Sequence, residues 1–215
     1  MAKKISLHQH IRSLIYDQLL EGTLKPGQRV SLTEFSKLTK STPTQVREVF
    51  ARFEQTGAVK FVPKKGFTVN NLNKVEAIAS YKFIGTLQEF AMGETVYSEQ
   101  NLSKLKKAYA AIQAAKAPAD VLKEELAFHE LLISDCKNKI APELIRNLKL
   151  PLYKFELRFI KAGQKSRSSL LTYNQIVSLI EDENYDEAAE LARAHWRLSS
   201  MELSGEEDRH KDLID

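Results

Sequence analysis

The spacing of apolar residues changes twice along the chain, and the order of these changes limits the folds open to it. Apolar residues recur at helical spacing over residues 7–20, then from about 32 to 39, and again from residue 43. After Gly57 they alternate with a period of two on both sides of residues 63–66, which indicates a β-hairpin with a basic tip. From residue 74 the helical spacing returns. The pattern predicts three helices, a hairpin and then an all-helical segment.

The third of these helices has the most clearly marked start. Thr42 is typical of an N-cap, Pro43 of the first helical position, and Gln45 completes a capping box. The polar residues that fall off its apolar stripe are Thr44, Gln45, Arg47, Glu48 and Arg52. Three helices followed by a hairpin is the order of a winged helix-turn-helix, in which the third helix enters the major groove of DNA.

Charge is distributed unevenly between the two segments. Residues 1–72 contain 12 Lys and Arg against 5 Asp and Glu, whereas residues 73–215 contain 20 against 23. Concentrated positive charge favours a nucleic-acid partner, because binding to phosphates needs cations. Lys64 and Lys65 at the hairpin tip are expected to contact phosphates. Arg29 and Arg52 could contact DNA or form exposed ion pairs with nearby glutamates.

The second segment is predicted to be a bundle of about six helices. Their expected ranges are 74–98, 102–115, 119–137, 141–162, 167–182 and 185–203. The predicted fold class is therefore mainly α. A winged helix-turn-helix occupies residues 1–72, a helical bundle residues 73–203, and a charged tail residues 204–215.

Polar side chains on the apolar stripes of the bundle are the candidates for a second site. Glu125 precedes His129 by one helical turn, so a carboxylate and an imidazole should point inward together. Asn174 and His195 lie on the stripes of later helices. Buried polar groups need partners, either one another or a ligand.

Four short motifs occur in order along the first segment. They are Leu24-Lys25-Pro26-Gly27-Gln28-Arg29, Val46-Arg47-Glu48, Phe53-Glu54 followed by Gly57, and Pro63 followed by Gly66. Together they resemble the N-terminal domain of GntR-family bacterial transcription regulators. The resemblance implies that Arg47 lies against DNA and that Thr44 and Gln45 occupy contact positions. Thr42, at the start of the same helix, is a further candidate for contact with DNA. It also implies that Gly66 lets the wing backbone approach the groove.

Motifs of the second segment extend this resemblance. They resemble motifs of the all-helical ligand-binding (FCD) domain of the FadR subgroup. These motifs are Phe128-His129-Glu130-Leu131-Leu132, Asn138, and Asp186 with Ala188 and Ala189 before His195. In many such domains an aspartate and three histidines hold a divalent metal, to which a small organic acid binds. By position this set corresponds to Glu125, His129, Asn174 and His195. A zinc or nickel ion is one expectation, although an amide oxygen is a poor ligand for these metals.

The sequence is also compatible with two arrangements that contain no metal. Glu125 could hydrogen-bond His129, so that both buried polar groups have a partner. Alternatively, the two histidines and the asparagine could contact an effector directly. Tyr153 and Arg158 are further candidates for effector binding, with the arginine as the partner of an anion. A surface ion pair with Glu156 is the alternative for this arginine.

The remaining composition bears on localisation and catalysis. A single cysteine, Cys136, indicates a buried thiol in a reducing compartment, and no apolar run approaches the about 18 residues of a spanning helix. Without a signal-peptide pattern, we expect a cytoplasmic protein with no membrane partner. Glycine-rich phosphate loops, Ser/His/Asp arrangements and cysteine clusters are not visible, so an enzyme is not expected.

The sequence as a whole predicts a homodimeric transcription regulator that binds a palindromic operator in double-stranded DNA. A small metabolite, with an organic acid as the expected class, would bind the helical domain and change the affinity for DNA. One alternative is a DNA-binding protein whose helical domain only dimerises. Another is a metal-dependent hydrolase that uses Glu125, His129 and His195.

Overall fold

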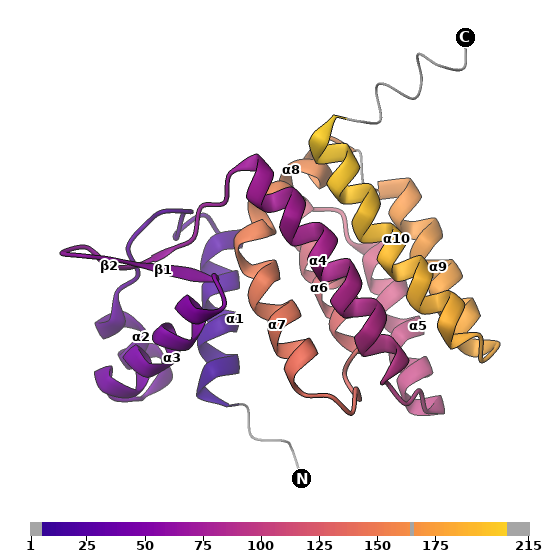
Figure 1. Ribbon diagram of the computed structural model, residues 1–215, viewed down its shortest axis with the longest axis horizontal. Helices are drawn as coiled ribbons and strands as arrows, with labels where there is room; N and C mark the ends of the chain where they lie inside the picture. The colour runs from indigo at the N-terminus through magenta and orange to yellow at the C-terminus, as the bar shows by residue number, and fades with distance from the viewer. Residues whose placement is uncertain (1–5, 164–165, 206–215) are drawn as a thin grey trace. The chain divides into compact units, whose positions relative to one another are not determined.

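The computed structural model describes residues 6–163 and 166–205, so residues 206–215 of the predicted tail lie outside it. The chain is mainly helical and contains one two-stranded antiparallel hairpin, which confirms the predicted fold class. Its described residues divide into two compact units, 6–71 with 147–154, and 72–146 with 155–163 and 166–205 (Figure 1). No described helix has the length and hydropathy needed to cross a membrane.

The first unit contains three short helices and the hairpin. Its elements are α1 (Leu7–Leu20), α2 (Leu32–Thr39), α3 (Pro43–Gln55), β1 (Val59–Val62) and β2 (Gly66–Val69). Phe50 of α3 joins them, because its ring lies 5.3 Å from Phe35 of α2 and 5.6 Å from Phe67 of β2, between ring centroids. The apolar stripe predicted for α3 is therefore the centre of this core.

The hairpin pairs Phe61 with Phe67, and its tip turns at Lys64, whose φ is 66°. Arg29, in the segment before α2, forms an isolated bridge with Thr68, so that segment lies against the hairpin. Phe61 is 40% exposed, whereas its cross-strand partner Phe67 is 5% exposed. The hairpin thus presents one aromatic ring as well as its basic tip.

The second unit is built from long helices. Its elements are α4 (Lys74–Gly93), α5 (Glu99–Ala114), α6 (Pro118–Leu131), α9 (Ser166–Glu181), α10 (Tyr185–Ser204), and most of α7 (Ile140–Lys149) and of α8 (Tyr153–Lys161). Helix α4 packs along α10, which also contacts α9, and α5 contacts α6 and α9 (Figure 1). At Gly85, an added Cβ would lie 3.1 Å from the Cβ of Trp196, so the glycine permits the close approach of α4 and α10.

Three of the predicted helices are interrupted or shorter, and the helix expected over 74–98 ends at Gly93. The helix expected over 141–162 is divided into α7 and α8 by a 3-10 turn, Leu150–Leu152, which contains Pro151. The helix expected over 119–137 ends at Leu131, and the carbonyl of Leu132 accepts a hydrogen bond from the Tyr97 hydroxyl at 2.7 Å. Pro151 has no backbone N–H to donate, which accounts for the division between α7 and α8.

Candidate functional site

The start of α3 is held by reciprocal hydrogen bonds, as the sequence predicts. The backbone N–H of Gln45 donates to Oγ1 of Thr42 at 3.3 Å, and Oε1 of Gln45 accepts from the backbone N–H of Thr42 at 3.0 Å. The Thr42 hydroxyl also donates to this Oε1, at 3.1 Å. The capping box therefore occupies the Gln45 oxygen and leaves its amide N–H groups for an acceptor outside the protein. Thr44, next along the helix, is exposed.

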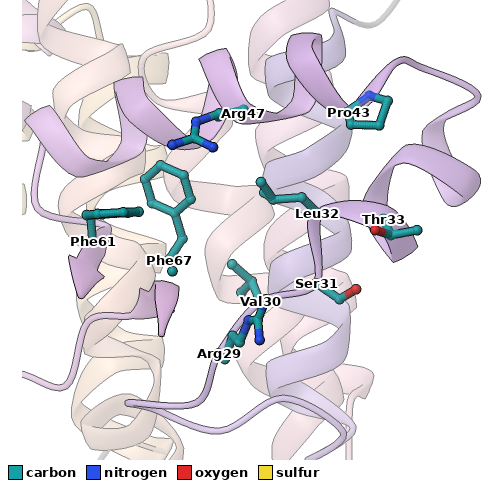
Figure 2. Close-up of a pocket in the computed structure, with 10 residues that line it drawn as sticks. Arg29, Val30, Ser31, Leu32, Thr33, Pro43, Arg47, Phe61 and Phe67 are labelled. Atoms are coloured by element: carbon teal, nitrogen blue, oxygen red, sulfur yellow. The ribbon is translucent and has the colours of Figure 1, made fainter. Parts of the chain in front are cut away.

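A groove of about 590 Å³ runs between the starts of α2 and α3 and the hairpin. Its lining residues are Arg29, Val30, Ser31, Leu32, Thr33, Pro43, Arg47, Phe61, Gly66 and Phe67 (Figure 2). Figure 2 shows Arg47 of α3 extending on the side of the groove where Phe61 and Phe67 lie. The predicted contact residues Arg29, Arg47 and Gly66 thus meet at one place, although they come from the segment before α2, from α3 and from β2.

The electrostatics of this groove favour an anion. The N-termini of α2 and α3 both border it, and a helix N-terminus carries partial positive charge and unsatisfied N–H groups. Arg29 and Arg47 add two full charges, and within the described residues neither forms an ion pair. Gly66, with φ of 86°, brings the wing backbone close to Arg29, since an added Cβ would lie 3.7 Å from Nε of that arginine.

The other residues predicted to contact DNA are exposed, but they differ in the hydrogen bonds that they form within the protein. Nζ of Lys65 donates to the carbonyl oxygen of Gly27 at 3.0 Å, which directs this lysine back toward its own unit. Lys64 is exposed at the tip of the hairpin, and Arg52 is exposed in the last turn of α3. The ion-pair alternative for Arg52 and Arg29 is not formed among the described residues.

A second arrangement of polar groups lies inside the helical unit. The hydroxyl of Tyr173 lies 3.3 Å from Nε2 of His129 and 3.1 Å from Nε2 of His195, and all three side chains are buried. Burial raises the pKa of Tyr173 well above its usual value, and the charges of Glu125 and Glu156 raise it further. Glu125, His129 and His195 therefore face inward near one another, as predicted, and a tyrosine hydroxyl lies between the two histidines.

Two further residues of this cluster were not predicted from the sequence. The indole Nε1–H of Trp196 donates to Oε1 of Gln88 at 2.7 Å, and Nε2 of Gln88 lies 3.1 Å from Nδ1 of His129. Gln88 is fully buried on the apolar stripe of α4, where it follows Tyr81 and Ile84. Its position on that stripe was the signal that could have identified it. We refer to Gln88, Glu125, His129, Tyr173, His195 and Trp196 as the interior cluster.

The expected inward position of Asn174 is wrong. Asn174 is exposed, whereas its neighbour Tyr173 is fully buried on the stripe that continues through Ile176 and Ile180. One residue corresponds to about 100° around a helix, so a shift of one position exchanges the interior for the surface. Tyr173 therefore takes the place that the resemblance assigned to the asparagine.

Two other candidate effector residues lie on α8. Tyr153 is buried at the start of the helix, and burial raises the pKa of its hydroxyl. Arg158 is exposed, so it does not provide a buried partner for an acid. Its alternative partner, Glu156, is buried, and no ion pair joins the two among the described residues.

The arrangement of the interior cluster does not fit a metal ion. Over residues 6–163 and 166–205, no group of three or more His, Cys, Asp or Glu side chains is positioned to hold one. The Nε2 atoms of His129 and His195, which would be the ligands, are both directed at the Tyr173 hydroxyl.

Comparison with known proteins identifies a domain family and two relatives of this chain. The FCD domain family matches residues 86–198, which is more than half of the chain. The HTH-type transcriptional regulator YdhC of Bacillus subtilis (strain 168) is 20% identical over 198 residues, covering 89% of this chain and 87% of YdhC. The HTH-type transcriptional regulator McbR of Escherichia coli (strain K12) is 26% identical over 121 residues, covering 55% of each chain.

Solved structures share the fold over nearly the whole chain. The structure of E. coli McbR/YncC matches with a TM-score of 0.69 and 19% identity, covering 94% of this chain and 99% of that one. A GntR transcriptional regulator from Rhodococcus sp. RHA1 matches with a TM-score of 0.69 and 17% identity, covering 92% and 97%. The similar proteins are transcription regulators and not enzymes.

Proposed function

The chain belongs to the FCD-domain family of GntR-type transcriptional regulators, and we propose that it binds double-stranded DNA through the groove at the start of α3. The observation that carries this proposal is the convergence of Arg29, Arg47 and two helix N-termini on one open groove. Phosphates bind such a combination of backbone N–H groups and guanidinium charge.

In this proposal the first two turns of α3 enter the major groove. Arg47 donates to a guanine or to a phosphate, and the Gln45 amide N–H groups, which the capping box leaves available, donate to a base acceptor. Arg29 contacts the backbone from the opposite wall of the groove. The exposed Lys64 extends the contact to the phosphates beside the wing.

The active form in this proposal is a homodimer on a palindromic operator. Phe83 and Phe90 lie two turns apart on one face of α4 and are 51% and 50% exposed. Large apolar side chains at such spacing are suited to pairing with the same face of a second copy. Two copies would then present two α3 helices to half-sites related by the same two-fold axis.

A small-molecule effector is the second part of the proposal. The interior cluster supplies histidine, tyrosine and carboxylate groups inside the helical unit, and a metabolite that displaces some of their mutual hydrogen bonds would change the stability of that unit. An organic acid remains a prediction. Coupling of about 1 to 3 kcal/mol would change operator affinity by roughly 5- to 150-fold.

DNA binding is tested by enrichment of random duplexes with the full-length protein, followed by sequencing and titration of the selected duplex. We expect a motif with two inverted half-sites, and tight binding that weakens steeply as salt is raised. Failure of any motif to become enriched, together with equal affinity for all duplexes, would show that the groove does not recognise a sequence.

Effector binding is tested by calorimetry with panels of small organic acids and amines on the full-length protein. A saturable heat that is lost in the Tyr173→Phe variant would support the interior cluster as the effector site. The absence of saturable heat across both panels would favour the alternative in which the helical unit only dimerises.

A further inference from the structure

The contact between Trp196 and Gln88 has a fixed hydrogen-bond direction. An indole nitrogen is a donor only, so the atom of Gln88 that faces it at 2.7 Å must be the carbonyl oxygen. The other end of the same amide is therefore the NH₂ group, which faces Nδ1 of His129 at 3.1 Å. All three side chains are buried, at 4% exposure or less, so water does not replace these partners.

This direction determines the tautomer of His129. Because the Gln88 NH₂ group donates to Nδ1, that nitrogen is the acceptor and carries no proton. A neutral His129 then carries its proton on Nε2, which faces the Tyr173 hydroxyl at 3.3 Å. The tyrosine oxygen accepts this hydrogen bond and its own O–H remains available to Nε2 of His195, 3.1 Å away, or to the nearby carboxylate of Glu125.

We propose that Trp196, acting through Gln88, holds His129 as the Nε2–H tautomer and thereby closes the interior cluster to a metal ion, with the Tyr173 hydroxyl joining the two histidines instead. Trp196 and Gln88 are positioning residues in this proposal. The inference rests on the contacts inside the helical unit and does not depend on DNA binding.

A metal ion bound at Nε2 of His129 would require the other tautomer of this histidine and the reverse orientation of the Gln88 amide. A histidine that ligates through Nε2 must have no proton there, and its Nδ1–H then donates to a carboxylate or carbonyl oxygen. To provide that oxygen, the Gln88 amide would have to turn over, which would place its NH₂ group against the indole N–H of Trp196. Two buried donors would then face each other without an acceptor.

The first test reads the tautomer directly. Nuclear magnetic resonance of the full-length protein with ¹⁵N-labelled histidine should show His129 protonated on Nε2 and unprotonated on Nδ1, with the His129→Gln variant providing the assignment. In Trp196→Phe, which keeps a ring but removes the N–H, the population with Nδ1–H should increase. A proton on Nδ1 of His129 in the unaltered protein would overturn the proposal.

The second test uses zinc alone as the probe. The unaltered protein should take up far less than one equivalent of zinc. Tyr173→His adds a third imidazole but leaves the tautomer restrained, so it should bind zinc weakly. Combining it with Trp196→Phe should tighten zinc binding by about 10- to 100-fold, the range known for groups that orient metal ligands.

A matched pair of double variants distinguishes an effect of the His129 tautomer on zinc binding from an effect of added charge. Gln88→Glu with Tyr173→His provides an acceptor to both Trp196 and His129 but also adds a negative charge, whereas Trp196→Phe with Tyr173→His adds none. Both double variants should bind zinc more tightly than Tyr173→His alone. A gain only in the variant with Glu would assign the effect to charge and overturn the proposal, as would one equivalent of tightly bound zinc in the unaltered protein.

Discussion

Arg47 is the residue on which sequence recognition is expected to depend most. It lies in the second turn of α3, it is exposed, and it borders the groove together with Arg29. Replacing Arg47 by Ala should weaken binding to the selected duplex by about 1 to 3 kcal/mol if the side chain contacts a base edge. Titration of labelled duplexes at constant salt measures this loss.

A matched control for this variant is Arg158→Ala. It removes the same charge from an exposed arginine of α8 that forms no ion pair among the described residues. Its affinity for the duplex should stay within the experimental error of the unaltered protein. If both variants lose affinity equally, the effect of Arg47 is one of net charge and not of contact.

The two lysines of the wing are expected to contribute unequally. Nζ of Lys65 is hydrogen-bonded to the carbonyl of Gly27, whereas Lys64 is exposed at the tip. Lys64→Ala should therefore reduce the slope of log K against log salt by nearly one, the effect of one lost phosphate contact, and Lys65→Ala should reduce it less. Equal slopes for Lys64→Ala and the unaltered protein would show that the wing tip stays away from DNA.

At the scale of elements, the contact between α4 and α10 is set by Gly85. An added Cβ at this position would lie 3.1 Å from the Cβ of Trp196 and 3.3 Å from the carbonyl oxygen of Arg193. We expect Gly85→Ala to lower the free energy of unfolding, because overpacking of about 1 to 3 kcal/mol exceeds the about 1 kcal/mol gained in helix propensity. Denaturant unfolding of the full chain provides the measurement.

Gly93→Ala is the control on the same helix. Nothing lies within 4 Å of a Cβ added at Gly93, so this substitution should leave stability unchanged or raise it slightly. If Gly85→Ala proves at least as stable as Gly93→Ala, the two helices can separate without loss and the glycine is not required for their packing.

At the scale of the whole molecule, dimerisation is the property to test. Replacing both Phe83 and Phe90 of α4 by Glu should shift the protein toward the monomer, because charges would then face each other across the proposed interface. Sedimentation measures the oligomeric state, and binding to a palindrome compared with a half-site measures the consequence for DNA. The double variant should no longer bind the palindrome more tightly than the half-site.

Leu171→Glu is the control for this pair. Leu171 is 61% exposed on α9, so the substitution places a glutamate at a different apolar surface position. The protein should keep the oligomeric state of the unaltered chain. An unchanged oligomeric state in the double variant of α4 would place the interface elsewhere.

The sequence predicts the site residues of the first unit more completely than those of the second, for a physical reason. The start of α3 was predicted residue by residue, because a capping box depends on groups only three positions apart. The interior cluster was predicted only in part, because Gln88 and Trp196 are 108 positions apart and no local pattern connects them. Asn174 was misplaced because an apolar stripe defines a helical face only to within about one residue.

By itself, the sequence determined the mainly helical class, the three helices with their hairpin, the family, and the inward direction of Glu125, His129 and His195. Those features follow from periodicity, capping and motifs, which are local. Only the tertiary structure decided that Arg29, Arg47 and Gly66 share one groove and that the Tyr173 hydroxyl joins the two histidines. Such contacts depend on how separate elements pack, since side chains far apart in the chain meet only after the helices take their places.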